Sequence, residues 1–310
     1  MGQVYDTVII GAGPGGLAAG LYAGRAKMSA VIVAKSLPGG QAATTAELEN
    51  YPGFPKGTTG PALTQAMADH TASFGTGIVQ EEVVDVDLGA DPKVVKVYGG
   101  KEYLARTVIL APGASPKSLH LQGEREFLGK GVSYCATCDG DFFEDLDVAV
   151  IGNGDTAVEE AMYLTRFAEN VTIIVRRKEG DLRCNKSSAE RAFANPKIHW
   201  MWDSAPQEIQ GDGLVERLIV RNTQTGDLSE LKVDGVFFFV GTEPQTGFLQ
   251  GKVELDQDGY IIANDMMETS VPGVYAVGDA RQKFLRQVIT AAADGAIAAV
   301  AAEKYIAGRE

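Results

Sequence analysis

Two glycine-rich segments, each directly after a short apolar run, constrain the fold of this chain more than any other feature. The first is Gly11-Ala12-Gly13-Pro14-Gly15-Gly16, which follows the strand-like run Tyr5 to Ile10 and precedes an alanine-rich, helix-like segment from Leu17 to Arg25. Such a turn lets the backbone approach a pyrophosphate, while the N-terminus of the following helix faces its charge. The order of strand, glycine turn and helix therefore predicts an α/β fold that binds a dinucleotide.

The second glycine segment, Gly152-Asn153-Gly154-Asp155-Thr156-Ala157, repeats this arrangement. It follows Val148-Ala149-Val150-Ile151 and leads into a helical stretch from Val158 to Phe167 and a strand from Val171 to Val175. Arg176 and Arg177 come directly after that strand, where guanidinium groups can accommodate the 2'-phosphate that separates NADP from NAD. The alternative is a solvated basic turn, because such pairs are common on surfaces.

A C-x-x-C pair lies between the two glycine segments, in Cys135-Ala136-Thr137-Cys138-Asp139. Such a pair can close a small disulfide and reopen as a dithiol, and an adjacent carboxyl can shuttle the proton that thiol exchange requires. The alternative is half of a zinc site, which needs two more ligands. For that purpose the chain offers only Cys184 and three scattered histidines, His70, His120 and His199. We therefore predict two nucleotide cofactors serving one dithiol, and no metal site.

Composition narrows the class of protein and its partners. A chain of 310 residues with 45% hydrophobic and 22% charged residues is typical of a soluble globular protein with two domains. The net charge of -13, with no lysine or arginine run, argues against nucleic acid as a partner. We identify neither a signal peptide nor a membrane span. Three cysteines, two of them in one C-x-x-C, suit a reducing compartment, so we expect a cytoplasmic protein.

Further motifs carry a resemblance to a known family. In chain order they are Pro38-Gly39-Gly40-Gln41, Glu49-Asn50-Tyr51-Pro52-Gly53, Leu110-Ala111-Pro112-Gly113-Ala114, Cys135-Ala136-Thr137-Cys138-Asp139-Gly140, Gly278-Asp279 and Arg286-Gln287. With them the chain resembles the low-molecular-weight thioredoxin reductases, FAD enzymes of the pyridine nucleotide-disulfide oxidoreductase class, over essentially its whole length. The resemblance implies hydride transfer from NADPH to flavin, passage of the electron pair to the disulfide, and thiol exchange with thioredoxin.

The resemblance also implies a domain organisation. Two Rossmann-like, three-layer α/β domains are expected, the second inserted into the first. Residues 1–114 and 244–310 would form a discontinuous FAD-binding domain, and residues 115–243 would form an NAD(P)H-binding domain that carries the dithiol. Members of the family are usually homodimers whose two domains rotate to present the dithiol alternately to flavin and to thioredoxin.

Site residues follow by position from the same resemblance. Cys138 would lie against the flavin in the oxidised form, Cys135 would attack the partner disulfide, and Asp139 would manage protons. The expected FAD-binding residues are Gly11, Gly13 and Gly16 at the pyrophosphate, Gln41 and Asn50 near the flavin, and Gly278, Asp279, Arg286 and Gln287 at its ribityl and ring region. The expected NADPH-binding residues are Gly152, Gly154, Asp155, Thr156, Arg176, Arg177 and Arg183.

The chain departs from the family pattern near the expected NADPH site. Val175 replaces a histidine before the two arginines, and five residues rather than three separate Arg177 from Arg183, which indicates a two-residue insertion around Lys178 to Asp181. Asn153 replaces the middle glycine of the second glycine segment, and Asp141 replaces an aromatic residue after the dithiol. The changes at Val175, at the insertion and at Asn153 lie where NADPH would bind, and Asp141 places another charge near the dithiol.

The departures leave three interpretations of function. The first is NADPH-dependent thioredoxin reduction, which the surviving arginines favour. The second is the same disulfide reductase supplied by ferredoxin or another donor, although an acidic protein would need a local basic patch to dock an acidic ferredoxin. The third is a flavin redox sensor that turns over no disulfide, against which the intact C-x-x-C argues.

Two features of the second half are predicted to be structural. Trp200 and Trp202 alternate about Met201 in a strand-like run, which indicates packing rather than cofactor binding. Cys184 follows Arg183 and is interpreted as an incidental thiol.

Overall fold

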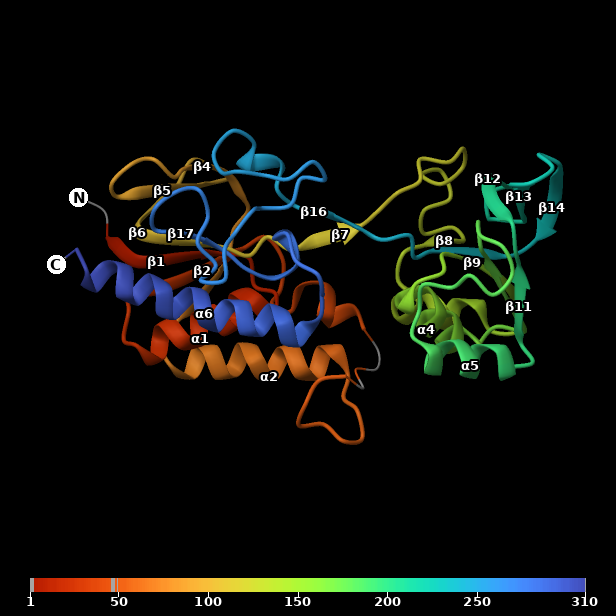
Figure 1. The fold of residues 1–310 in the computed structure, drawn as a ribbon, viewed down its shortest axis with the longest axis horizontal. Helices are drawn as coiled ribbons and strands as arrows, with labels where there is room; N and C mark the ends of the chain where they lie inside the picture. Colours follow the sequence, from red (N-terminus) through yellow and green to blue (C-terminus); the bar gives the residue numbers. More distant parts are fainter. Residues whose placement is uncertain (1–2, 46–47, 49, 310) are drawn as a thin grey trace. The chain divides into compact units, whose positions relative to one another are not determined.

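The chain folds into two compact units in a computed structural model that describes residues 3–45, 48 and 50–309, with the backbone alone of Cys138. The first unit comprises Met1–Ser115 and Glu243–Glu310, and the second comprises Pro116–Thr242 (Figure 1). The chain passes from one unit to the other in the short strands β7 (Ala114–Pro116) and β16 (Thr242–Pro244), which pair with each other. The second unit is thus an insertion within the first.

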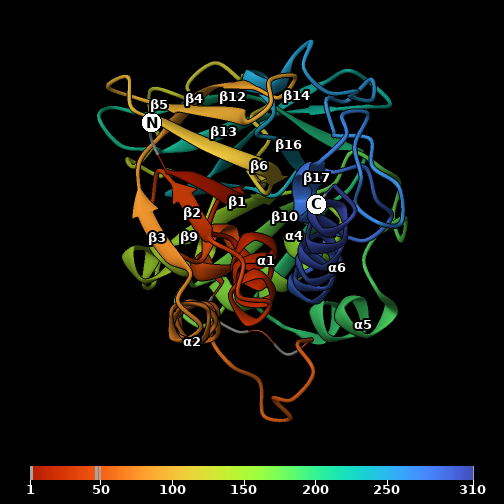
Figure 2. The same ribbon diagram turned by 90° about the vertical axis from the view of Figure 1, so that its left-hand side faces the viewer.

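The first unit is built on one mixed sheet with the order β3-β2-β1-β6-β5-β4, and with β17 also pairing β6. Its parallel strands are β1 (Val4–Ile10), β2 (Ala30–Ala34), β3 (Gly77–Gln80), β6 (Glu102–Leu110) and β17 (Val274–Ala276). Antiparallel strands β4 (Val83–Asp87) and β5 (Lys93–Val97) extend it. Helices α1 (Pro14–Arg25), α2 (Gly60–Ser73) and α6 (Val288–Ala307) lie together, with α1 between the other two (Figure 2).

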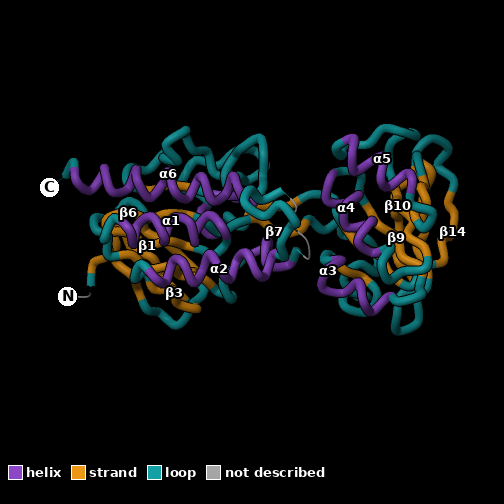
Figure 3. Tube along the Cα trace, turned by 90° about the horizontal axis from the view of Figure 1, so that it is seen from below, coloured by secondary structure: helices purple, strands orange, loops and turns teal. Residues whose placement is uncertain are grey.

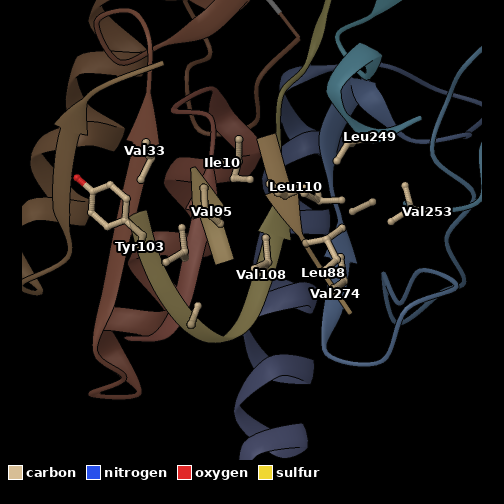
Figure 4. Packing of buried hydrophobic residues seen from close by; sticks show 14 of the residues in the cluster. Ile10, Val33, Leu88, Val95, Tyr103, Val108, Leu110, Leu249, Val253 and Val274 are labelled. Carbon is tan, nitrogen blue, oxygen red and sulfur yellow. The ribbon is translucent and has the colours of Figure 1, made fainter. Parts of the chain in front are cut away.

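Alternation along the strands fills both faces of this sheet, because successive side chains point to opposite sides. Val8 and Ile10 of β1 join the cluster around Leu110, Val95 and Leu88 (Figure 4). Ile9, which lies between them, joins a second cluster with alanines of α1 and α6. Both faces are covered, which explains why the strand reads as a continuous apolar run.

The second unit has the same plan with different helices. Its parallel sheet, in the order β11-β10-β9-β15-β8, comprises β8 (Val132–Ser133), β9 (Asp147–Ile151), β10 (Asn170–Ile174), β11 (Ile198–Met201) and β15 (Gly235–Phe238). Helices α3 (Ala136–Asp139), α4 (Asp155–Leu164) and α5 (Lys186–Ala194) lie beside one another at this sheet (Figure 3). A separate antiparallel sheet consists of β12 (Ser204–Gln210), β13 (Arg217–Asn222) and β14 (Leu228–Lys232).

The predicted fold class, two Rossmann-like α/β domains, is confirmed, because each unit contains the strand, glycine turn and helix that the sequence indicates. The bounds of two expected helices were wrong. The helix expected from Leu17 to Arg25 begins earlier, at Pro14. The helix expected from Val158 to Phe167 runs from Asp155 to Leu164, since Gly154 is itself its N-cap. The glycine segment therefore runs directly into the helix. The free peptide N–H groups of the first helical turn lie next to the glycines.

Trp200 and Trp202 pack within the second unit, as their alternation predicts. Their rings stack with centroids 5.0 Å apart, and Phe193 of α5 lies 4.8 Å from Trp200. Both tryptophans are partly buried against the core of β9, β10 and α4. They therefore join α5 to the edge strand β11.

Glu160 of α4 is a partly buried acid whose Oε2 atom is buried, and this has a measurable consequence. Burial and the neighbouring charge of Glu159 raise its pKa from 4.5 to about 7, and its Oε2 has no hydrogen-bond partner in the described part of the chain. Between these two pKa values the folded protein holds this proton while the unfolded chain releases it, so stability falls as pH rises through that window. We expect Glu160→Gln to stabilise the protein by about 1–3 kcal/mol near pH 8 and to have little effect near pH 4.

Urea unfolding at both pH values measures this effect. Glu169→Gln is the matched control, because Glu169 is exposed and lies shortly after the same helix. An equal gain in both variants, or a gain that does not depend on pH, would contradict the assignment to Glu160.

Candidate cofactor and dithiol sites

The glycines of the first glycine turn have two different roles. Two of them leave no room for a side chain, and one borders open space. Gly11 has a φ of 106°, and a Cβ there would lie 2.1 Å from the carbonyl oxygen of Ala111. A Cβ on Gly16 would lie 1.9 Å from the carbonyl oxygen of Gly11. Gly13 has an ordinary φ of -75°, and a Cβ there would meet no described atom within 4 Å. Gly13 is also the N-cap of α1 and makes no side-chain capping bond, so the helix N-terminus is available to an anion.

Replacement of Gly13 by alanine tests which glycine borders the cofactor. The added methyl group has room in the protein, but it would occupy the space in which a pyrophosphate is expected. We expect Gly13→Ala to weaken FAD binding by about tenfold to hundredfold while leaving the fold intact. Fluorescence titration of the apoprotein with FAD measures this affinity, and circular dichroism checks the fold.

Gly77→Ala is the control for that experiment. Gly77 also lacks a positive φ, and a Cβ there would meet no described atom within 4 Å, but this glycine begins β3 rather than a helix. Similar FAD affinities for the two variants would rule out the role assigned to Gly13.

Distant segments meet beside this turn. The backbone N–H of Gly39 donates to the carbonyl of Ala12 at 2.8 Å, which joins the segment containing Gln41 to the glycine turn. Asn50 donates from its Nδ2 to Oε1 of Gln287 at 3.0 Å. Gln41 itself is exposed, in the short helix η1 (Gly40–Thr44). The structure thus brings Asn50 and Gln287 together, and it places Gln41 on a segment anchored to the same turn.

Asp279 presents a buried carboxylate oxygen without a partner. It lies in the short helix η4 (Gly278–Ala280), where Gly278 adopts a φ of 71°. Oδ1 of Asp279 is buried and has no hydrogen-bond partner among the described residues, and burial raises the pKa of this carboxyl. Arg286 donates to the Asp279 carbonyl at 3.3 Å and stacks over Tyr260. The unpartnered, buried Oδ1 of Asp279 lies on a short helix that packs against α1, whose N-terminus is uncapped. This arrangement fits the hydroxyl and phosphate groups of FAD.

Asp294 is a residue of this site that the sequence analysis missed. Its carboxylate accepts from Arg281 at 2.9 and 3.0 Å, from Lys283 at 2.7 Å and from the backbone N–H of Gly278 at 3.0 Å. Burial acts to raise its pKa, but the bonds from Arg281 and Lys283 hold the pKa of Asp294 below its ordinary value. The sequence does contain a sign of this role, because Asp294 is an acid within the alanine-rich run of α6. A charge at such a position needs a buried partner. Asp294 therefore anchors the turn that carries Asp279.

The dithiol segment begins where β8 ends. Cys135 is disulfide-bonded, whereas Cys184 is a free thiol. The side chain of Cys138, the predicted partner, lies outside the described atoms. The Ser133 hydroxyl donates to Oδ2 of Asp139 at 2.6 Å and accepts from the backbone N–H of Cys135 at 3.0 Å. Ser133 thus holds the Asp139 carboxyl next to the cysteine segment, and its signal in the sequence was a serine at the end of an apolar strand.

The second glycine turn shows the same division of roles as the first. A Cβ on Gly152 would lie 2.3 Å from the carbonyl oxygen of Phe239, whereas one on Gly154 would meet no described atom within 4 Å. Asp155 does not present a free carboxylate, because its Oδ1 accepts from the backbone N–H and Nδ2 of Asn185 at 2.7 and 2.9 Å. Thr156 and the arginines Arg176 and Arg183 are exposed, and Arg177 pairs with Asp181 at 2.9 Å.

Comparison with known proteins identifies the family. The model of the pyridine nucleotide-disulphide oxidoreductases matches residues 5–295 of this chain. The chain belongs to this family. Thioredoxin reductases within the pyridine nucleotide-disulphide oxidoreductases use FAD and NADPH, and the present chain is an FAD-dependent oxidoreductase of this kind. The family membership predicted from the motifs is thus confirmed.

Individual members of the pyridine nucleotide-disulphide oxidoreductase family align over nearly the whole chain. The thioredoxin reductase of Peptoclostridium acidaminophilum is 52% identical over 99% of this chain and 98% of its own length. The crystal structure of Lactococcus lactis thioredoxin reductase is 41% identical, with a TM-score of 0.95 over 98% of this chain and 99% of that one. A ferredoxin-flavin thioredoxin reductase from Clostridium acetobutylicum is 29% identical, with a TM-score of 0.52 over 98% of each chain.

Neither a metal-binding cluster nor a membrane-spanning helix is found among the described residues. They contain no group of three or more histidine, cysteine, aspartate or glutamate side chains placed to hold a metal ion. Among the same residues, no helix combines the length and the apolar character needed to cross a membrane.

Proposed function

We propose that this protein is a thioredoxin-disulfide reductase that passes electrons from NADPH through FAD and the Cys135/Cys138 dithiol to thioredoxin. The observation that carries the proposal is the Asp139 carboxyl held by Ser133 beside a disulfide-bonded Cys135, on a chain that also has two dinucleotide turns. The net reaction converts NADPH, one proton and a disulfide to NADP⁺ and two thiols. FAD, when bound, would accept a hydride and pass its electron pair to the disulfide.

The cysteine chemistry is then carried by the chain's own residues. The thiolate of Cys135 attacks one sulfur of the thioredoxin disulfide and forms a mixed disulfide, and the other thioredoxin sulfur leaves as a thiolate. Asp139 supplies a proton to that leaving group. The thiolate of Cys138 next attacks the sulfur of Cys135 and restores the disulfide, and the second thioredoxin sulfur leaves as a thiolate that takes a proton from water. The short bond from Ser133 keeps the carboxyl of Asp139 in place for this proton transfer.

The two units have separate tasks in this proposal. The unit of residues 1–115 and 243–310 binds FAD through Gly13, Asp279 and the pair Asn50 and Gln287. The inserted unit binds NADPH through the N-terminus of α4 at Gly154, with Arg176, Arg177 and Arg183 near the 2'-phosphate. We further propose a cytoplasmic homodimer, in keeping with the resemblance and with the free thiol of Cys184.

Ferredoxin is the second candidate donor, because a ferredoxin-flavin thioredoxin reductase shares this fold. Its 29% identity is well below the 52% of the thioredoxin reductase from Peptoclostridium acidaminophilum. The three arginines beside the second glycine turn also suit the 2'-phosphate of NADPH. NADPH is therefore favoured, and a sensor without turnover is not.

Anaerobic titration of the FAD-loaded protein with NADPH and with NADH tests the proposal. Loss of flavin absorbance is followed first, and reduction of added thioredoxin is followed second. Rapid bleaching by NADPH with thioredoxin turnover is the expected result. Bleaching by reduced ferredoxin but by neither nucleotide would overturn the donor, and bleaching without thioredoxin turnover would overturn the substrate. Size-exclusion chromatography with light scattering checks the dimer.

A further inference from the structure

The inserted segment around Lys178 to Asp181 folds back onto the second glycine turn. Nδ2 of Asn153 donates to the carbonyl of Asp181 at 3.3 Å, and the backbone N–H of Arg183 donates to the carbonyl of Asn153 at 2.8 Å. The partly buried Leu182 joins the core of the unit between these contacts. The asparagine that replaces a glycine and the inserted loop are therefore one structural feature, because each holds the other in place.

The loop places a carboxylate on one of the three arginines. Oδ2 of Asp181 lies 2.9 Å from Nη1 of Arg177, and the two side chains are 37% and 41% exposed. Both ends of this contact are anchored, since the carbonyl of Asp181 is held by Asn153 and the carbonyl of Arg177 accepts from the backbone N–H of Asp203 at 2.9 Å. Within the described part of the chain, the guanidinium groups of Arg176 and Arg183 take part in no comparable ion pair. One guanidinium of the three is thus already paired with a carboxylate.

We propose that Asp181 is a specificity-determining residue that lowers the selectivity of this site for NADPH over NADH. This inference rests on the proposed function of the site as a nicotinamide nucleotide site. A 2'-phosphate that uses Arg177 must displace the Asp181 carboxylate or bind beside its negative charge. The 2'-hydroxyl of NADH carries no charge and meets neither cost. Asp181 therefore acts against the phosphate alone, which is the group that distinguishes the two nucleotides.

The expected size follows from the exposure of the pair. A half-exposed ion pair is a weak competitor, because water screens both charges. Removal of the Asp181 charge is expected to tighten binding of a 2'-phosphate by about three- to tenfold.

The test is calorimetric titration of the FAD-loaded protein and its Asp181→Asn variant with four probes. Two of the probes carry the 2'-phosphate, namely adenosine 2',5'-bisphosphate and NADP⁺, and the other two, 5'-AMP and NAD⁺, lack it. The variant should bind the first two about three- to tenfold more tightly and the other two with unchanged affinity. Glu179→Gln is the matched control, because it removes one negative charge from an exposed position of the same loop. The control should change no affinity by more than about twofold.

The outcomes separate this inference from the donor assignment. Unchanged affinity of Asp181→Asn for both phosphorylated probes would overturn the inference, and so would an equal gain in Glu179→Gln. A selective gain in Asp181→Asn would support it even if neither nucleotide reduced the flavin, because binding is measured without turnover. In that case the nucleotide site would stand and the electron donor would be wrong.

Discussion

Replacement of Cys135 by serine is expected to lower thioredoxin turnover by about 10³-fold or more, while NADPH still bleaches the flavin. A serine hydroxyl is not ionised near neutral pH, so it cannot attack the thioredoxin disulfide as the cysteine thiolate does. The variant also cannot close the disulfide in which Cys135 takes part. Stopped-flow absorbance measures flavin reduction, and a coupled assay of insulin reduction measures thioredoxin turnover. Flavin reduction should therefore persist in the variant, while thioredoxin turnover is lost.

Cys184→Ser is the control for this prediction. Cys184 is a free thiol on the loop before α5, and burial raises its pKa, which makes it a poor nucleophile. Its replacement should leave both flavin reduction and thioredoxin turnover unchanged. If Cys135→Ser retained substantial turnover, or if Cys184→Ser lost it, the dithiol would not be the site of exchange.

Replacement of Asp294 by alanine is expected to destabilise the protein by about 3–5 kcal/mol and to abolish tight FAD binding. The side chains of Arg281 and Lys283 are only 16% and 6% exposed, and both pair with Asp294. Without the carboxylate, two nearly buried cations lose their partner, and the backbone N–H of Gly278 loses its acceptor. The turn that carries Asp279 would then be free to move. Asp294→Asn, which keeps an acceptor for Gly278, should fall between the wild type and alanine.

Urea unfolding of the apoprotein and fluorescence titration with FAD measure the two effects separately. Asp265→Ala is the control, because Asp265 is an exposed acid of the same unit. The pKa of Asp294 is lowered in the folded state, so its stabilisation is present above its ordinary pKa and is lost as pH falls through the folded value. The difference between wild type and Asp294→Asn should therefore shrink in acid. A difference that grew in acid would contradict the assignment.

Local pattern determined most of the architecture in advance. The continuous apolar run through Val8, Ile9 and Ile10 indicates a strand with two buried faces, because neighbouring side chains of a strand point to opposite sides. The glycine turns could be recognised because each glycine segment directly follows a short apolar run and directly precedes a helix-like one. The C-x-x-C segment could likewise be recognised, since its chemistry depends on residues only three positions apart. In each case the cause lies within a few residues of its effect.

Only the tertiary structure decided which residues act together. Asp294 meets Arg281 and Lys283 because α6 lies against the turn of Asp279, and the pairing of Asn50 with Gln287 joins opposite ends of one unit. The contact of Asn153 with Asp181 likewise turned two separate departures from a family pattern into one loop that modifies a binding site. Sequence by itself determined the strands, the turns and the dithiol, whose rules are local. The partners of buried charges are set by long-range packing, and that packing exists only in the folded chain.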